Sequence, residues 1–210
     1  PVKRHGSMDA KYMSTIKKKT KTKKKLTKTQ MRVAVAKDVI AQLKSRKLIA
    51  QAGTYCDLGT SIRSEDMDRQ VNEVLKDKTC TVCALGGIFV AQVNRFNDLK
   101  VCEVPNLRAR FDNGSCGETT LYDDQIRDYI RKVFTPTQMS LIETAFEGRV
   151  MLDNKMKWDE SYYEASPKFQ RAEGMYFDGG KNIADKERMI LIMQNIIDNN
   201  GTFVPAETAI

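Results

Sequence analysis

Histidine is almost missing from this chain, and the one that it has, His5, lies among the first eight residues. Residues 1–8 resemble an expression leader ahead of Met8 and are excluded from the functional argument. The absence of any other histidine excludes Ser-His-Asp and Cys-His nucleophile systems, histidine-based zinc hydrolases and the His-x-Glu deaminase signature. A glycine-rich phosphate loop and a GxGxxG fingerprint are also absent. Any enzyme chemistry would have to use carboxylates, lysines or thiols, and none of these stands in a recognisable arrangement.

Long apolar runs are missing as well. No stretch of about 18 apolar residues occurs, so the sequence predicts no helix that crosses a membrane. The longest apolar-rich stretch, residues 82–93, is interrupted by Gly86, Gly87 and Gln92. The five cysteines are an odd number in a chain with ample core material, which favours reduced thiols in a cytosol-like compartment.

Charge is distributed very unevenly along the chain. Residues 1–30 hold eleven Lys or Arg against one acid, Asp9, whereas residues 31–210 hold 24 basic and 26 acidic residues. The net charge of +8 and the pI of about 9.2 therefore reflect the N-terminal segment alone. Residues 9–29 form a Lys-rich arm with too few apolar residues to offset the entropy of ordering, so we expect this arm to be disordered when unbound.

The arm is the first candidate for a binding site. Lysines that neutralise phosphates release condensed counterions, which gives salt-sensitive, sequence-independent binding to nucleic acid. The candidate contact residues are Lys17, Lys18, Lys19, Lys21, Lys23, Lys24, Lys25 and Lys28. Arginine is nearly absent from the arm and Tyr12 is its only aromatic residue, which argues against base reading and base stacking. The alternative is a solubilising or targeting tail.

The rest of the chain, residues 30–205, is expected to form a single compact, mainly α-helical domain. Apolar spacing and capping residues predict helices over about 29–46 (with Thr29 as N-cap), 64–75, 79–94, 120–134, 136–147, 160–165 and 184–199. Segment 98–117 predicts a short β-hairpin or an extended excursion, and 48–58 a loop with at most a short strand. Other parts of 149–181 are expected to be loop. Gly86 and Gly87 would let another backbone approach the helix at 79–94 closely.

Cys80 and Cys83 form a CxxC pair, which has three interpretations. With Cys56, and with Cys102 or Cys116, the pair would hold a structural zinc ion, although one close pair is only half of the usual signature. A thioredoxin-like redox site would need the pair after a strand, at a helix N-terminus. The interpretation that we favour treats Cys56, Cys80 and Cys83 as small buried apolar residues beside the central helix.

Two further groups of residues are explained more simply by structure than by chemistry. The acidic pairs Asp123-Asp124 and Asp159-Glu160 fit helix N-termini, where the helix dipole favours negative charge. The aromatic stretch 158–177 either lines an interface or fixes a long loop to the core.

Several segments of residues 30–205 resemble a group of small intracellular accessory proteins encoded by tailed bacteriophages. The resemblance lies in residues 32–40, Gly53-Thr-Tyr-Cys56, the stretch from Cys80 to Phe89, residues 138–146, and Asn195-Ile-Ile-Asp-Asn-Asn-Gly-Thr-Phe-Val-Pro205. It implies a protein that acts in the bacterial cytoplasm during infection by contacting host or phage components. The basic arm lies outside the resemblance, and no catalytic residue is implied by it.

These observations predict a non-enzymatic binding protein. We expect its folded domain to engage a protein partner, and its arm to attract nucleic acid without sequence preference. A zinc-stabilised nucleic-acid-binding protein is the alternative, and an enzyme that uses carboxylate or thiol chemistry is a further one. No membrane partner and no cofactor are expected; the sequence does not define the oligomeric state.

Overall fold

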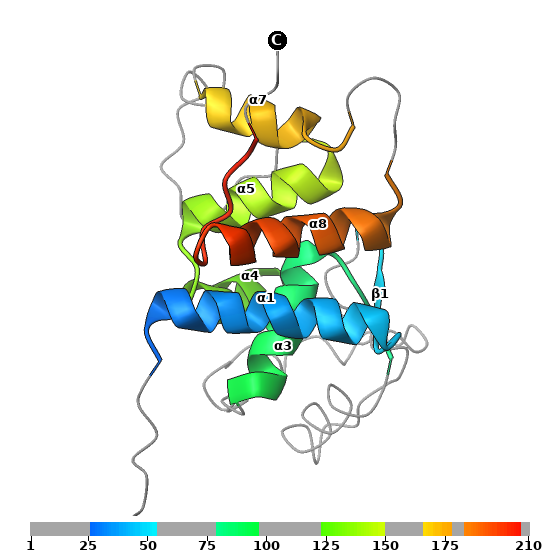
Figure 1. The fold of residues 1–210 in the computed structure, drawn as a ribbon, viewed down its shortest axis with the longest axis vertical. Helices are drawn as coiled ribbons and strands as arrows, with labels where there is room; N and C mark the ends of the chain where they lie inside the picture. Colours follow the sequence, from blue (N-terminus) through cyan, green and yellow to red (C-terminus); the bar gives the residue numbers. More distant parts are fainter. Residues whose placement is uncertain (1–25, 54–78, 97–122, 150–165, 178–182, 207–210) are drawn as a thin grey trace, which may run out of the picture.

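The computed structural model describes residues 26–53, 79–96, 123–149, 166–177 and 183–206. Within these ranges the chain is mainly α-helical, as predicted, with six helices and two strands (Figure 1). The elements are α1 (Lys28–Lys44), β1 (Leu48–Ala50), β2 (Cys80–Val82), α3 (Ala84–Phe96), α4 (Asp123–Arg131), α5 (Pro136–Glu147), α7 (Pro167–Gly174) and α8 (Asp185–Asp198). The predicted arm residues 9–25, the helices at 64–75 and 160–165, and the hairpin at 98–117 lie outside the described residues.

Helix α1 begins with a complete capping box. The Thr27 hydroxyl accepts from the Gln30 N–H at 3.2 Å, and the Gln30 side chain accepts from the Thr27 N–H at 3.0 Å. The predicted N-cap, Thr29, was therefore wrong by two residues. Thr29 is followed three positions later by Arg32, which lacks the acceptor that a capping box requires, whereas Thr27 is followed by Gln30.

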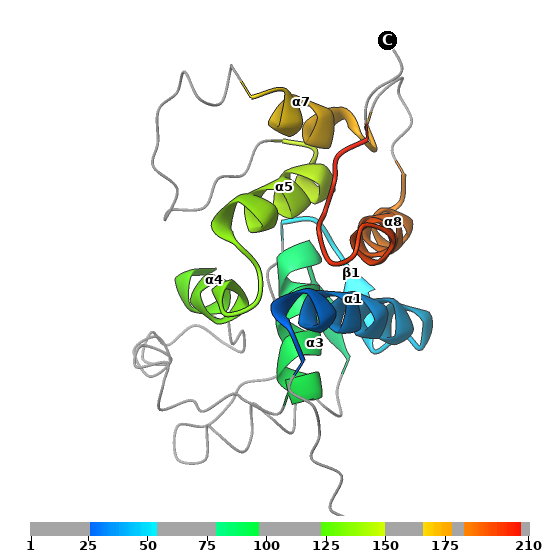
Figure 2. The ribbon, with the colours of Figure 1, turned by 60° about the vertical axis from the view of Figure 1, so that its left-hand side comes forward.

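Helices α1 and α8 lie side by side along their length and bury their apolar faces against each other (Figures 1 and 2). The predicted stop after α8 is confirmed at Gly201, whose N–H donates to the Ile196 carbonyl at 2.7 Å with φ of +84°. A Cβ at this position would lie 2.8 Å from the Thr29 carbonyl oxygen. The end of α8 therefore packs directly on the first turn of α1.

The two strands form a parallel sheet, in which Leu48 pairs with Cys80 and Ala50 with Val82. The helix predicted over 79–94 therefore begins later than expected, because residues 80–82 are extended and α3 starts at Ala84. Residues 48–50 supply the short strand that was expected within 48–58. Parallel pairing brings the carboxyl ends of both strands to one edge.

Helix α3 is the central helix, as predicted. Residues 84–93 are all buried, and α1, α4 and α5 pack around it (Figure 2). Among the described residues, the atoms nearest to a Cβ at Gly87 are side-chain atoms of Met189 at 3.4 Å and Val39 at 3.6 Å, and the backbone approach expected there is not found. These are ordinary van der Waals distances.

Helix α5 begins and ends where its sequence predicted. Thr135 caps it, Pro136 occupies the first turn, and Gly148 ends it in the left-handed conformation with φ of +65°. The Gln138 side chain does not complete a capping box. It bonds both backbone groups of Phe203 instead, at 3.1 Å to the carbonyl and 2.6 Å from the N–H. Gln138 thus fixes the C-terminal segment around Phe203 to α5.

Helix α7 was missed by the sequence analysis, which expected loop here. Pro167 starts it, and only Phe169 and Ala172 face the core. Eight residues with two buried positions give too short a periodic pattern to be recognised. In the described part of the chain, no helix has the length and apolar character needed to span a bilayer.

Replacing Gly201 by alanine should lower the free energy of unfolding by about 2–4 kcal/mol, because the methyl group is strained by φ and meets the Thr29 carbonyl. Gly53→Ala is the matched control: its φ is +77°, but nothing lies within 4 Å of its Cβ position. We expect it to cost about 1–2 kcal/mol, the conformational part alone. The free energy of unfolding of each variant is measured by urea unfolding. If the two variants lose the same amount, the contact between the end of α8 and the start of α1 is not tight.

Candidate functional site

The structure places only some of the predicted site residues. Lys17 to Lys25 and Cys56 lie outside the described residues. Lys28 is the first residue of α1 and its side chain is exposed. Cys80 and Cys83 are both buried, at 0% and 2% exposure, which fits the interpretation that they pack as small apolar residues.

The two cysteines of the CxxC pair are separated by extended backbone, because residues 80–82 form β2. Cys80 begins β2 and Cys83 immediately precedes α3, where its carbonyl accepts from the Gly87 N–H at 2.9 Å. Three nearly extended residues span about 10 Å, whereas a disulfide requires Cα atoms within about 7 Å. The two cysteines are not joined in a disulfide. The strand that separates them was the feature that sequence reasoning missed.

Burial controls the chemistry of the Cys83 thiol. A thiol at a helix N-terminus is ordinarily acidified, but here burial raises the pKa of Cys83 to about 12, with the nearby Glu143 and Glu147 carboxylates adding to the shift. The thiol is therefore protonated at neutral pH and is a poor nucleophile. Among the described residues no three His, Cys, Asp or Glu side chains form a metal-binding group. Zinc binding that involves Cys56 stays a prediction.

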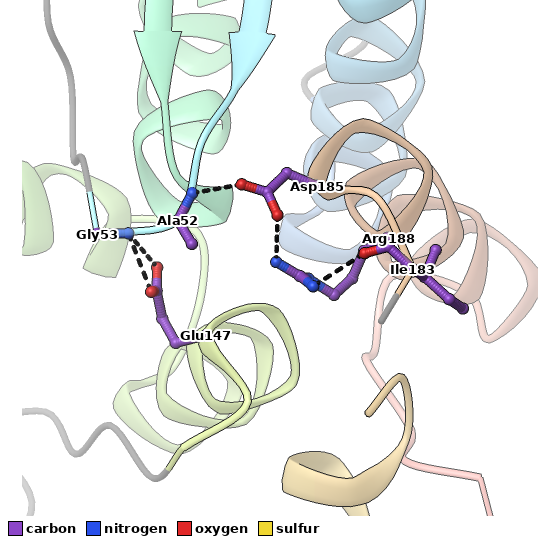
Figure 3. Close-up of polar contacts among 6 residues, drawn as sticks. All are labelled: Ala52, Gly53, Glu147, Ile183, Asp185 and Arg188. Carbon is purple, nitrogen blue, oxygen red and sulfur yellow. Dashed lines mark hydrogen bonds and ion pairs between the residues drawn. The ribbon is translucent and has the colours of Figure 1, made fainter. Parts of the chain in front are cut away.

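Two carboxylates converge on the chain that leaves β1 (Figure 3). Asp185, in the first turn of α8, accepts from the Ala52 N–H at 2.8 Å. Glu147, at the end of α5, accepts from the Gly53 N–H through both oxygens, at 3.0 and 3.2 Å. Consecutive backbone donors at the carboxyl end of the strand are thus satisfied by acids from two different helices.

Arg188 lies next to Asp185 and is almost fully buried, at 2% exposure. Its guanidinium donates to Asp185 at 2.6 Å and to the Ile183 carbonyl at 3.0 Å (Figure 3). The guanidinium carbon also lies 4.9 Å from the centre of the Phe146 ring and 4.4 Å from that of Phe177. The cation is compensated by an ion pair, a carbonyl and two aromatic faces.

A second buried ion pair joins α4 to α5. Arg127 donates to Glu143, and their side chains are only 8% and 2% exposed. Glu143 and Glu147 lie four residues apart on α5, so both carboxylates fall on its inner face. Glu143 accepts from the Arg127 guanidinium, and Glu147 accepts from the Gly53 N–H. Both carboxylates therefore join α5 to another part of the fold.

The sequence carried a signal for these residues that was not used. Glu143 falls between the core positions Met139 and Phe146, and Arg188 begins the stripe that continues through Ile192 and Ile196. A charged residue at a core position of an amphipathic helix indicates a buried partner. The identity of that partner depends on the tertiary fold.

The outward side of α1 is basic. Lys37, Ala41 and Lys44 are exposed at helical spacing, and Arg46 and Lys47 are exposed directly after the helix. We call Lys37, Lys44, Arg46 and Lys47 the basic end of α1. The one acid of α1, Asp38, is partly buried and accepts from Gln42 at 2.7 Å. Arg32, also on α1, faces inward and donates to the Val133 carbonyl at 2.8 Å.

Comparison with protein-family models, with curated proteins and with solved structures gives no match for this chain. The site must therefore be interpreted from its own geometry.

Replacing Arg188 by methionine should lower the free energy of unfolding by about 2–4 kcal/mol, because it breaks a buried ion pair and leaves Asp185 partly desolvated. Asp128→Asn is the control, since the pair of Asp128 with Arg131 joins residues of one helix and Asp128 is 65% exposed. This control should cost at most about 1 kcal/mol. Similar losses for the two variants in urea unfolding would contradict the structural role given to Arg188.

Burial raises the pKa of Glu147 above its ordinary value of 4.5, and the hydrogen bond from the Gly53 N–H opposes part of this shift. From pH 4.5 up to the raised folded-state pKa, the folded protein keeps a proton that the unfolded chain has lost. Unfolding therefore releases a proton in this window, and the contribution of Glu147 to stability falls as the pH rises. The stability of the wild type minus that of Glu147→Gln should decrease from pH 4.5 upward. Urea unfolding at several pH values measures this difference. An increase of the difference with pH would show that the folded state lowers the pKa of Glu147 and does not raise it.

Proposed function

We propose that this chain is a non-enzymatic binding protein that attracts nucleic acid through its Lys-rich arm and engages a protein partner through its folded domain. The observation that carries the proposal is the charge distribution. Nine lysines and one acid fall within residues 9–30, against a nearly neutral remainder of the chain. Such a concentration of lysine gives affinity for phosphate backbones that needs no base recognition.

The attachment of the arm supports this proposal. The chain enters α1 through a capped first turn at Thr27, so the arm is anchored to a helix that packs along α8. A polybasic segment on a firm anchor can hold a polyanion near the folded domain, and the domain then gains a high local concentration of that ligand.

The proposal assigns no enzymatic role, because the polar groups that the structure describes in the interior are engaged in structural contacts. Glu147 and Asp185 accept backbone hydrogen bonds, Glu143 pairs with Arg127, and the Cys83 thiol is protonated. The protein partner and a place of action in the bacterial cytoplasm are supported by the resemblance to phage accessory proteins, which implies contact with host or phage components.

The arm is tested by a variant in which glutamine replaces the eight lysines of residues 9–25, with Lys28 kept because it belongs to α1. The slope of log affinity against log salt concentration for duplex DNA should become shallower by about 0.9 for each lysine that contacted a phosphate. Fluorescence anisotropy over a salt series measures this slope.

A second variant, with arginine at the same eight positions, keeps the charge and should keep the slope. Circular dichroism should show the same helix content in all three proteins. If the glutamine variant binds duplex DNA with an unchanged slope, the arm does not bind nucleic acid and the proposal is wrong.

A further inference from the structure

The geometry points to the basic end of α1 as a second, rigid contact for the polyanion that the arm attracts, with the phosphate backbone of a nucleic-acid duplex as the ligand. This inference rests on the proposed nucleic-acid binding. The basic end consists of Lys37, Lys44, Arg46 and Lys47, all of which are exposed.

The position of these residues relative to the arm gives the first argument. The arm joins α1 at Thr27, and the basic end begins in the middle of the helix, at Lys37, and continues past its last residue, Lys44. At about 1.5 Å per residue, Lys37 lies about 15 Å and Lys44 about 25 Å along the axis from Thr27. A duplex that runs along α1 from its start to Lys44 covers about seven base pairs at roughly 3.4 Å each.

Stiffness gives the second argument. A duplex keeps its direction over about 150 base pairs, so it can lie along α1 and reach both positive regions without bending. Lys37 and Lys44 are seven residues apart on one side of the helix, a rise of about 10 Å, and therefore face the same ligand.

The chemistry of the exposed stripe favours backbone contact. Its members on α1 are Lys37, Ala41 and Lys44, so it offers no aromatic side chain on which a single-stranded base could stack. An anionic membrane fits less well, since a helix that lies on a bilayer needs an exposed apolar face. The apolar face of α1, which includes Val35, Val39 and Leu43, is buried in the core.

Among the described residues, the acids of α1 and of the first turn of α8 are bonded to other groups or balanced by a lysine. Asp185, on α8, is occupied by the Ala52 N–H and by Arg188. The first turn of α8 also exposes Lys186 and Glu187, one charge of each sign. Asp38 on α1 is partly buried and bonded to Gln42.

The test uses the full chain with Lys37→Gln and Lys44→Gln combined, which removes two charges at little cost in helix propensity. The probes are a mixed-sequence DNA duplex of roughly 16 base pairs, long enough to reach both regions, and a single strand of the same length. The slope of log affinity against log salt for the duplex should become shallower by about 2, and the duplex should lose more affinity than the single strand.

The matched control combines Arg149→Gln and Lys168→Gln, which also removes two exposed charges. Lys168 lies on α7 and Arg149 follows α5, and α7 is at the other end of the molecule from α1 (Figures 1 and 2). This control should leave the slope for the duplex within about 0.5 of the wild type.

The outcomes separate this inference from the proposed function. If the α1 variant keeps the wild-type slope while the arm variant loses it, the basic end is not a contact and the arm's role stands. If only the α1 variant changes the slope, the rigid contact stands and the arm's role fails. If the α1 variant loses binding to vesicles of phosphatidylcholine and phosphatidylserine but not to the duplex, the ligand is a membrane and the inference is overturned.

Discussion

The buried guanidinium of Arg188 is the interaction on which the arrangement of the described helices depends. It binds Asp185 and the Ile183 carbonyl, and lies over the rings of Phe146 and Phe177. Through the second oxygen of Asp185 it is also linked to the chain that follows β1. A cation without these partners would be costly to bury. The end of α5, the start of α8, the turn after α7 and the chain after β1 therefore meet around this cation and its Asp185 partner.

The same constraint applies to the other polar groups that the structure describes next to β1. The carboxyl edge of a parallel sheet is where ligands often bind, because side chains and backbone groups converge there. In this chain Glu147 and Asp185 fill that place and use their oxygens on the Gly53 and Ala52 N–H groups. No sequence motif pointed to these two acids, and in the described structure they join the chain after β1 to α5 and α8. On the outward side of α1, the exposed charged residues Lys37 and Lys44 are both basic.

Local sequence predicted much of the helical framework but little of what connects it. The apolar spacing of α1, α5 and α8, the Pro136 start and the stops at Gly148 and Gly201 are properties of neighbouring residues, so they could be recognised in advance. Strand β2 could not, because its three residues become extended by pairing with residues about thirty positions earlier. Arg188 and Glu143 look like ordinary charged helix residues until the fold supplies Asp185 and Arg127. The basic end of α1 was present in the sequence, but the near-neutral sum over residues 31–210 hid it.

The boundary at Thr27 changes how the arm and the folded domain act together. A polybasic tail on a flexible joint would hold its ligand in every orientation, and its affinity would depend on the tail alone. Here the Thr27–Gln30 capping box and the packing of Gly201 on Thr29 fix the direction in which α1 begins. A stiff ligand that is held at one end of α1 then meets the basic end in an intramolecular step, at an effective concentration set by the helix length. Under the proposed function, a duplex that contacts both the arm and the basic end of α1 would be held more tightly than by the arm alone, because the second contact forms within the complex.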